Sequence, residues 1–156
     1  MTVTVGVDVY ADLTEADAYF AARLVGDWAA ASVVEREAAL LRATAYLDGR
    51  YRWIGRRAEA EQPLGWPRLG ATDPEGRTHL GIPVSVKHAC AELACIALSQ
   101  DLAPQADRGG RVVAERVGAV ELRYAEDAPV GRAYPYIDLL LTGLVRGAAS
   151  VAVRRA

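Results

Sequence analysis

The apolar and polar positions of residues 32–51 follow the repeat of a long helix. Ser32 and Glu35 form the pattern of a capping box, in which each side chain accepts a hydrogen bond from a free backbone N–H of the first turn. Because the apolar face is wider than that of a surface helix, we expect this helix to pack against two neighbours. The face consists of two adjacent stripes, one with Val34, Ala38, Leu41 and Ala45, the other with Val33, Leu40, Leu47 and Tyr51.

A second apolar segment predicts a central helix over residues 83–101. Pro83 and Ser85 lie at its start, and Pro104 follows its end. A helix that is apolar nearly all round is buried. Leu41 of the first helix and Leu93 of this one are predicted core residues, so each change to alanine is expected to cost about 2–5 kcal/mol. The apolar residues of the segment are Val86, Ala89, Cys90, Ala91, Leu93, Cys95, Ile96, Ala97 and Leu98.

Two shorter helices are predicted near the ends of the chain. Thr14 and Asp17 form a weak capping box for a short helix that Gly26 stops. Pro135 suits the first position of a last helix, which Gly147 closes. The apolar stripe of that last helix is Ile137, Leu140, Leu141 and Leu144.

Alternation of apolar and polar residues predicts β-structure at two places. The valines of residues 2–9 lie on one face of a short strand, whose partner lies in the same subunit or in a neighbouring one. Residues 111–125 form two alternating runs around Gly118 and Ala119, which suits a hairpin with a two-residue type II′ turn. Because an isolated hairpin is marginal in water, we expect it to lie on the helices or on another subunit.

The expected fold class is therefore mainly α, a small helical bundle with one protruding β-hairpin and extended terminal arms. A length of 156 residues suits one domain, which we place at residues 1–147, with the hairpin at 111–125 and a C-terminal tail at 148–156. Residues 55–81 have no periodic pattern, and long loops of this kind are usually functional or disordered. Leu64, Trp66 and Leu69 predict that this loop is held against the surface.

Composition restricts the possible functions. The hydrophobic fraction of 52% and the charged fraction of 24% are ordinary for a soluble globular protein. A net charge of −2 argues against a protein whose main task is to hold nucleic-acid phosphates, although it leaves room for a local basic patch. No apolar run approaches the roughly 20 residues of a membrane span, and the N-terminus lacks the pattern of a signal peptide. We therefore expect assembly in the cytoplasm and no membrane partner.

Motifs for catalysis, metal binding or cofactor binding are missing from the sequence. It contains no Gly-rich phosphate loop, no nucleophile elbow and no zinc-protease motif. Cys90 and Cys95 point in different directions on one helix, so we expect two small buried hydrophobic residues and no disulfide. His79 and His88 are too few to complete a zinc site. We expect no enzyme activity, no catalytic residue, no metal and no cofactor.

A basic and aromatic cluster follows the long helix, and three interpretations of it are open. In the first, arginines contact nucleic-acid phosphates while aromatic rings stack on bases. In the second, the tryptophans cover the core and the arginines extend along the surface or pair with Asp48, Glu59 and Glu61. In the third, Arg52, Arg56, Arg57 and Trp66 form a charged interface between subunits. The whole cluster contains Arg50, Tyr51, Arg52, Trp53, Arg56, Arg57 and Trp66.

The order of these segments resembles the head–tail connector (adaptor) proteins of tailed bacteriophages and related gene transfer particles. Some members of that family are described as DnaT-like single-stranded-DNA-binding proteins. The resemblance covers most of the chain, and its specificity comes from order and spacing. The residues that carry it are LTEADAYFAAR (13–23), ALLRATAYLDGRYRWIGRR (39–57), QPLGWPR (62–68) and IPVSVKHACAELA (82–94), followed by the hairpin and Tyr134-Pro135.

This resemblance implies structural work in a virion. Such proteins are expected to form a homo-dodecameric ring that docks on the portal protein and joins it to a neck, stopper or tail-completion protein, with genomic DNA passing through the lumen. The implied location is the head–tail junction. Connectors of this kind are expected to reach the portal with the C-terminal segment, which makes Val151, Val153, Arg154 and Arg155 the candidate docking residues. The alternative is a replication accessory protein that binds single-stranded DNA.

Overall fold

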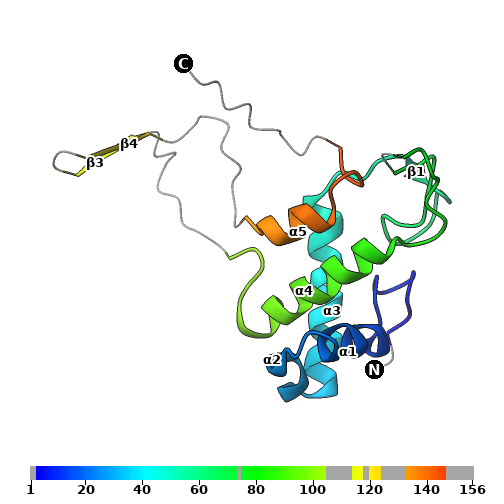
Figure 1. Ribbon diagram of the computed structural model, residues 1–156, viewed down its shortest axis with the longest axis horizontal. Helices are drawn as coiled ribbons and strands as arrows, with labels where there is room; N and C mark the ends of the chain where they lie inside the picture. Colours follow the sequence, from blue (N-terminus) through cyan, green and yellow to red (C-terminus); the bar gives the residue numbers. More distant parts are fainter. Residues whose placement is uncertain (1–2, 74, 105–113, 118–119, 124–132, 147–156) are drawn as a thin grey trace. The chain divides into compact units, whose positions relative to one another are not determined.

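The computed structural model describes residues 3–73, 75–104, 114–117, 120–123 and 133–146. The chain divides into two compact units, one with residues 1–102 and 134–156, the other with residues 103–133. The prediction of a mainly helical fold is confirmed (Figure 1). No described helix is long and apolar enough to cross a bilayer. The helices are α1 (Leu13–Ala21), α2 (Gly26–Ala30), α3 (Val33–Arg50), α4 (Val84–Ser99) and α5 (Pro135–Leu140), and the strands are β1 (Arg56–Arg57), β2 (Arg68–Leu69), β3 (Ala114–Val117) and β4 (Val120–Arg123).

Helices α3 and α4 form the centre of the first unit. The Ser32 hydroxyl accepts from the Glu35 N–H, and the Glu35 carboxylate accepts from the Ser32 N–H, so the predicted capping box starts α3. Helix α4 packs against α3 and also contacts α1, α2 and α5 (Figure 1). Its buried residues, Leu93 and Cys90 among them, cover most of its circumference, which confirms the predicted central helix. Both cysteines are free, and burial raises the pKa of the Cys90 thiol to about 11.

The two apolar stripes expected on α3 are buried to different extents, and in the more buried one Val33 is still 51% exposed and Tyr51 is half-buried. Leu40 and Leu47 are fully buried. Val34 is 68% exposed, Ala38 and Ala45 are exposed, and Leu41 is half-buried. Helix α3 contacts both α4 and α1, so the two expected neighbours are present, but they leave Val34, Ala38 and Ala45 exposed.

The N-terminal strand prediction is wrong. The Thr4 carbonyl accepts from the backbone N–H groups of residues 7, 8 and 9, so this segment is a tight turn. Only an isolated bridge joins Val5 and Val9. Val9 and Tyr10 are fully buried, which means that the described N-terminal segment belongs to the core and is not an extended arm.

The limits of the short helices also differ from the prediction. Asp12 and Glu15 form the capping box of α1, two residues before the expected position of a cap at Thr14. Gly26 begins α2 and does not merely stop α1. Helix α5 begins at Pro135 as predicted but ends at Leu140. A turn follows the helix, and the chain reverses there at Gly143, whose φ of 82° is accessible to glycine.

The two remaining predictions of local structure are confirmed where the structure describes them. Strands β3 and β4 pair antiparallel with Val117 opposite Val120, inside the unit of residues 103–133. The turn at residues 118–119 and the tail at 148–156 lie outside the described residues. In the loop after α3, Leu64 and Trp66 are buried, so the loop is held against the body as expected. Within it, β1 and β2 form a short antiparallel ribbon.

Candidate nucleic-acid interface

Asp48, in the last turn of α3, holds the following loop to the helix through hydrogen bonds to its carboxylate. Its Oδ1 accepts hydrogen bonds from the Tyr10 hydroxyl and from the Trp53 indole N–H at 2.9 Å. Its Oδ2 accepts from the Gly65 backbone N–H at 2.8 Å. Burial of the Tyr10 ring, together with the hydrogen bond to this carboxylate, raises the pKa of the Tyr10 hydroxyl. Three donors from three segments therefore converge on one carboxylate.

Two glycines allow the loop to come this close. A Cβ atom at Gly65 would lie 2.5 Å from Asp48 Oδ1 and 2.6 Å from Trp53 Nε1, so no side chain fits there. Gly55 has a φ of 69°, and a Cβ atom there would lie 2.5 Å from the carbonyl oxygen of Leu69. Both positions require glycine, one for close approach and the other for backbone conformation as well.

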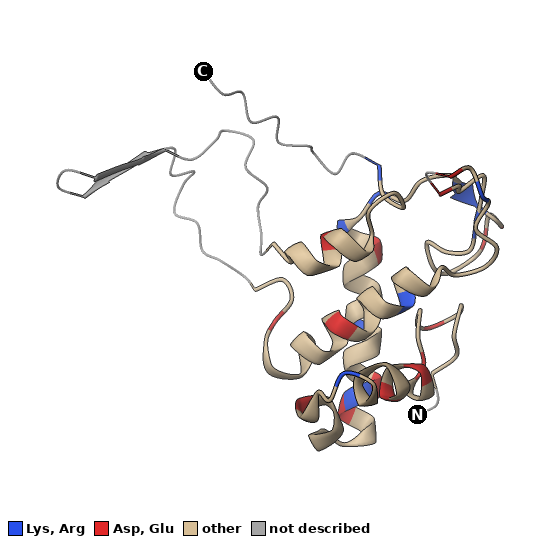
Figure 2. Ribbon diagram, in the orientation of Figure 1, with Lys and Arg blue, Asp and Glu red and all other residues tan. Residues whose placement is uncertain are grey.

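An open groove of about 820 Å³ lies at this end of α3, and arginines dominate its lining. Figure 2 shows basic residues at β1, which forms part of this surface. The acidic residue in the lining is Asp48, whose carboxylate already accepts three hydrogen bonds. The arginines of this arginine groove are Arg52, Arg56, Arg57, Arg68 and Arg146.

Two of these arginines are fixed by backbone carbonyls. The Arg68 guanidinium donates to the carbonyl of Gly65 at 2.9 Å, to that of Gly55 at 3.0 Å and to that of Ile54. Burial, followed by repulsion from Arg146 and Arg57, lowers the pKa of Arg68. Arg146 donates through Nη2 to the Gly55 carbonyl at 3.0 Å and through its backbone N–H to the Arg52 carbonyl at 2.6 Å. The floor of the groove is thus a preorganised positive surface.

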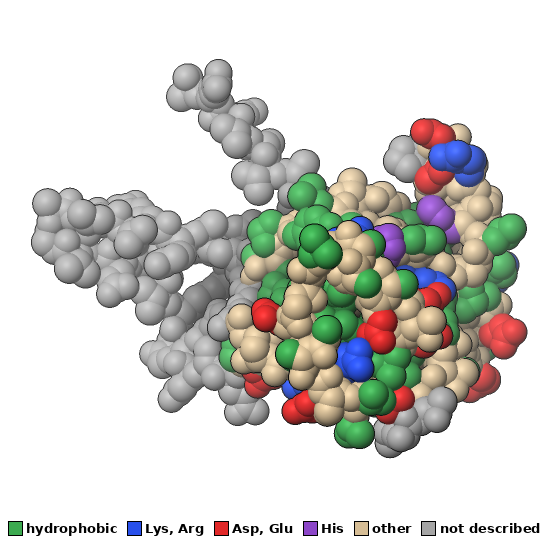
Figure 3. Space-filling view, turned by 60° about the horizontal axis from the view of Figure 1, so that its bottom comes forward, with side chains coloured by type: hydrophobic (Ala, Val, Ile, Leu, Met, Phe, Trp, Pro, Cys, Tyr) green, Lys and Arg blue, Asp and Glu red, His purple; other side chains and the backbone are tan. Residues whose placement is uncertain are grey.

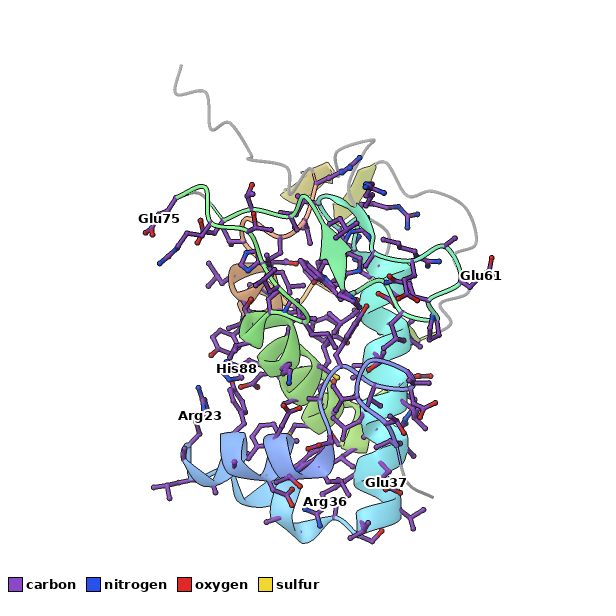
Figure 4. All side chains as sticks on the ribbon, turned by 90° about the vertical axis from the view of Figure 1, so that its right-hand side faces the viewer. Arg23, Arg36, Glu37, Glu61, Glu75 and His88 are labelled. Atoms are coloured by element: carbon purple, nitrogen blue, oxygen red, sulfur yellow. The ribbon has the colours of Figure 1, made fainter. Side chains whose placement is uncertain are left out.

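The other three arginines, Arg52, Arg56 and Arg57, are exposed. No described residue forms an ion pair with them, so the expected pairing with Asp48, Glu59 and Glu61 is wrong. Glu61 points away from the body in Figure 4. In contrast, the α1–α2 end of the molecule shows acidic and basic side chains mixed together (Figure 3).

The tryptophans serve the core and not the surface. Trp53 is 6% exposed and Trp66 is 0% exposed, and their rings meet edge to face at a centroid distance of 6.0 Å. The packing interpretation of the tryptophans is therefore confirmed, and neither ring is available to stack on a base. Trp66, which the sequence placed with the interface candidates, lies inside the fold. Tyr51 is half-buried and donates its hydroxyl hydrogen to Asp138 at 2.7 Å.

The groove differs from the cluster predicted from sequence at three arginines. Arg68 and Arg146 line it although sequence reasoning missed both, while Arg50 lies near the Tyr51 ring and outside the groove lining. Arg68 follows Trp66-Pro67, which was a local signal, but nothing near Arg146 indicates its position beside Arg52. Val151, Val153, Arg154 and Arg155 lie outside the described residues. In the described chain, no group of three His, Cys, Asp or Glu residues could hold a metal ion.

One comparison with known proteins gives a match. A family model described as "Putative DnaT-like ssDNA binding protein" matches residues 2–156, which is nearly the whole chain. No curated protein and no solved structure gives a significant match.

Proposed function

The chain belongs to the DnaT-like ssDNA-binding family, and from this membership we propose that it contacts the phosphate backbone of DNA through the arginine groove. The observation that carries the proposal is that Arg52, Arg56 and Arg57, beside the anchored Arg68 and Arg146, form no ion pair with any residue that the structure describes. Phosphates supply the negative charge that no described side chain supplies to these three arginines.

The chemistry of the groove favours contacts that do not depend on sequence. Arginine binds phosphate oxygens with a planar fork of donors, and phosphate contacts carry no direct sequence information. Stacking of bases on Trp53 or Trp66 is prevented by their burial. Because the whole chain carries a net charge of −2, surfaces outside the groove attract DNA weakly. The groove therefore orients DNA as well as binding it.

Within this activity we propose the role of a head–tail connector in a tailed phage or phage-like particle. The order of elements supports it, since a helical body with a hairpin between the central helix and the last helix is the pattern that the resemblance implied. The proposal includes a homo-dodecameric ring, docking on the portal, contact with a neck or tail-completion protein, and a place at the head–tail junction. It assigns neither enzyme activity nor a cofactor to the chain.

A single-stranded-DNA-binding replication accessory is the second candidate. The description of the matching family favours it, and so does the groove, whose basic character the net charge of the chain does not reveal. The two roles predict different strengths of binding. DNA that must slide through a channel should be held loosely, so a connector should bind duplex DNA no more tightly than about 10⁻⁵ M at physiological salt.

The triple variant Arg52→Ala, Arg56→Ala, Arg57→Ala should bind a single-stranded oligonucleotide about threefold to 150-fold more weakly at low salt. Each exposed ion pair contributes about 0.2–1 kcal/mol, and about 1.4 kcal/mol is a factor of ten. The slope of log affinity against log salt should fall by about 0.7 for each lost phosphate contact. Fluorescence anisotropy measures both quantities. The control Arg23→Ala, Arg42→Ala, Arg77→Ala changes net charge equally outside the groove, and equal losses in both variants would contradict the assignment.

Mass photometry and electron microscopy separate the two roles. A connector should form rings on purified portal protein, and its binding of DNA should be no tighter than about 10⁻⁵ M at physiological salt. An accessory protein should remain a small oligomer and retain submicromolar affinity for single strands at that salt. The second result would overturn the connector role and leave the groove assignment standing.

A further inference from the structure

The outer face of α3 carries an apolar stripe that the described chain leaves largely exposed, with only Leu41 packed in part against the core. Val34 is 68% exposed, Ala38 and Ala45 are exposed, and Leu41 is half-buried. In Figure 4, α4 lies on one side of α3, and the opposite side carries side chains that point away from the body. Apolar residues gathered on one exposed face commonly mark an interaction surface. We propose that this face binds the same face of a second copy of the chain, with the two α3 helices antiparallel.

The sizes of the side chains are complementary in this arrangement. The stripe spans about 16 Å, at about 1.5 Å per residue. A two-fold axis through its middle places Val34 opposite Ala45 of the second copy and Leu41 opposite Ala38 of the second copy. Each large side chain then meets a small one, which allows close helix packing in the manner of ridges and grooves.

The charges at the edge of the stripe are complementary in the same arrangement. On the helical wheel Glu35 and Arg42 lie along one edge of the stripe, two turns apart. A two-fold axis perpendicular to both helices places the charged edges of the two copies on the same side of the pair. The N-terminal end of one edge then lies beside the C-terminal end of the other. Glu35 therefore meets Arg42 of the second copy, and the reverse contact forms as well. A parallel pair would instead place Glu35 level with Glu35 of the second copy, with no opposite charge at that height.

Both charged groups are able to make this contact. Glu35 holds Ser32 through Oε2, which leaves Oε1 for a cation. Arg42 is exposed, and its guanidinium makes only a long contact of 3.4 Å with the Ala38 carbonyl among the described residues. The arginine groove begins at Asp48, beyond the C-terminal end of the stripe, so this pairing and DNA binding use different surfaces.

Sedimentation velocity from about 5 to 500 µM tests the pairing, since small interfaces form weak and concentration-dependent complexes. The average mass of the natural chain should rise toward that of a dimer, whereas Ala38→Glu should stay monomeric because two carboxylates meet near the axis. The control Ala29→Glu places the same charge at an exposed position of α2 and should behave as the natural chain does. A natural chain that is monomeric throughout, or an Ala38→Glu chain that pairs equally well, would overturn the proposal. Binding of DNA by Ala38→Glu should be unchanged, which keeps this test separate from that of the groove.

Cysteine cross-linking in a Cys95→Ser background tests the orientation. The double variant Val34→Cys, Ala45→Cys should form a covalent dimer under mild oxidation and stop there, because two disulfides close a two-fold pair. Val34→Cys alone should remain uncross-linked, since the two copies of this position lie at opposite ends of an antiparallel pair. Cross-linking of the single variant would indicate a parallel pair, and a ladder of higher oligomers from the double variant would indicate head-to-tail contacts. Either result would overturn the antiparallel pair.

Discussion

Replacing Asp48 with alanine is expected to lower the free energy of unfolding by about 3–9 kcal/mol. The change leaves three donors without an acceptor, namely the Tyr10 hydroxyl, the Trp53 indole N–H and the Gly65 backbone N–H. Tyr10 and Trp53 are 0% and 6% exposed, so water replaces the lost acceptor poorly. Each buried polar group left unsatisfied costs about 1–3 kcal/mol. Because domains are stable by only about 5–15 kcal/mol, this loss approaches complete unfolding.

Urea denaturation followed by Trp fluorescence measures the effect. Asp48→Asn should be milder, since one amide oxygen can still accept from Tyr10 and Trp53 while the amide nitrogen faces the Gly65 N–H. Glu61→Ala, at an exposed acid on the same loop, should change the stability by less than about 0.5 kcal/mol. A loss below about 1 kcal/mol for Asp48→Ala would show that the carboxylate does not hold the loop to α3.

Leu93→Ala should be the second large effect, with a loss of about 2–5 kcal/mol. Leu93 is 0% exposed on the central helix, and its removal deletes methyl groups from the core and leaves a cavity. Leu41→Ala is the matched control, because the same atoms are removed from a half-buried position on the outer face of α3. We expect its loss to stay below about 1.5 kcal/mol, and both are read from the same denaturation curves at low micromolar protein.

The comparison of Leu93→Ala with Leu41→Ala tests whether the two leucines differ in burial, which the sequence does not show. The apolar pattern predicts the same loss for both, because both belong to stripes of helical spacing. Equal large losses at a concentration where the chain is monomeric would mean that the outer face of α3 is covered within one chain. That outcome would also remove the basis for pairing through this face.

The sequence by itself determined the elements whose signals are local. The capping box at Ser32 and Glu35, the apolar circumference of α4 and Pro135 at the start of α5 all act within a few residues, so pattern and spacing were enough to place them. The local signal was misleading at α1, where the sequence predicted a cap at Thr14 and the structure has it at Asp12, directly after the buried Tyr10 and Ala11.

Only the tertiary structure decided which apolar surfaces are inside and which charges are free. Helical spacing predicted two apolar stripes on α3 and did not show which of them is buried. The packing of α4 buries Leu40 and Leu47 of one stripe. The character of the groove depends on Arg146 lying beside Arg52 and on Asp48 being occupied by Tyr10, Trp53 and Gly65, contacts between segments far apart in the chain. The net charge of the chain and the spacing of its residues carry no information about such contacts. For that reason a chain with a net charge of −2 can carry a groove lined by five arginines, three of which form no ion pair with a described residue, and the sequence alone leaves this undecided.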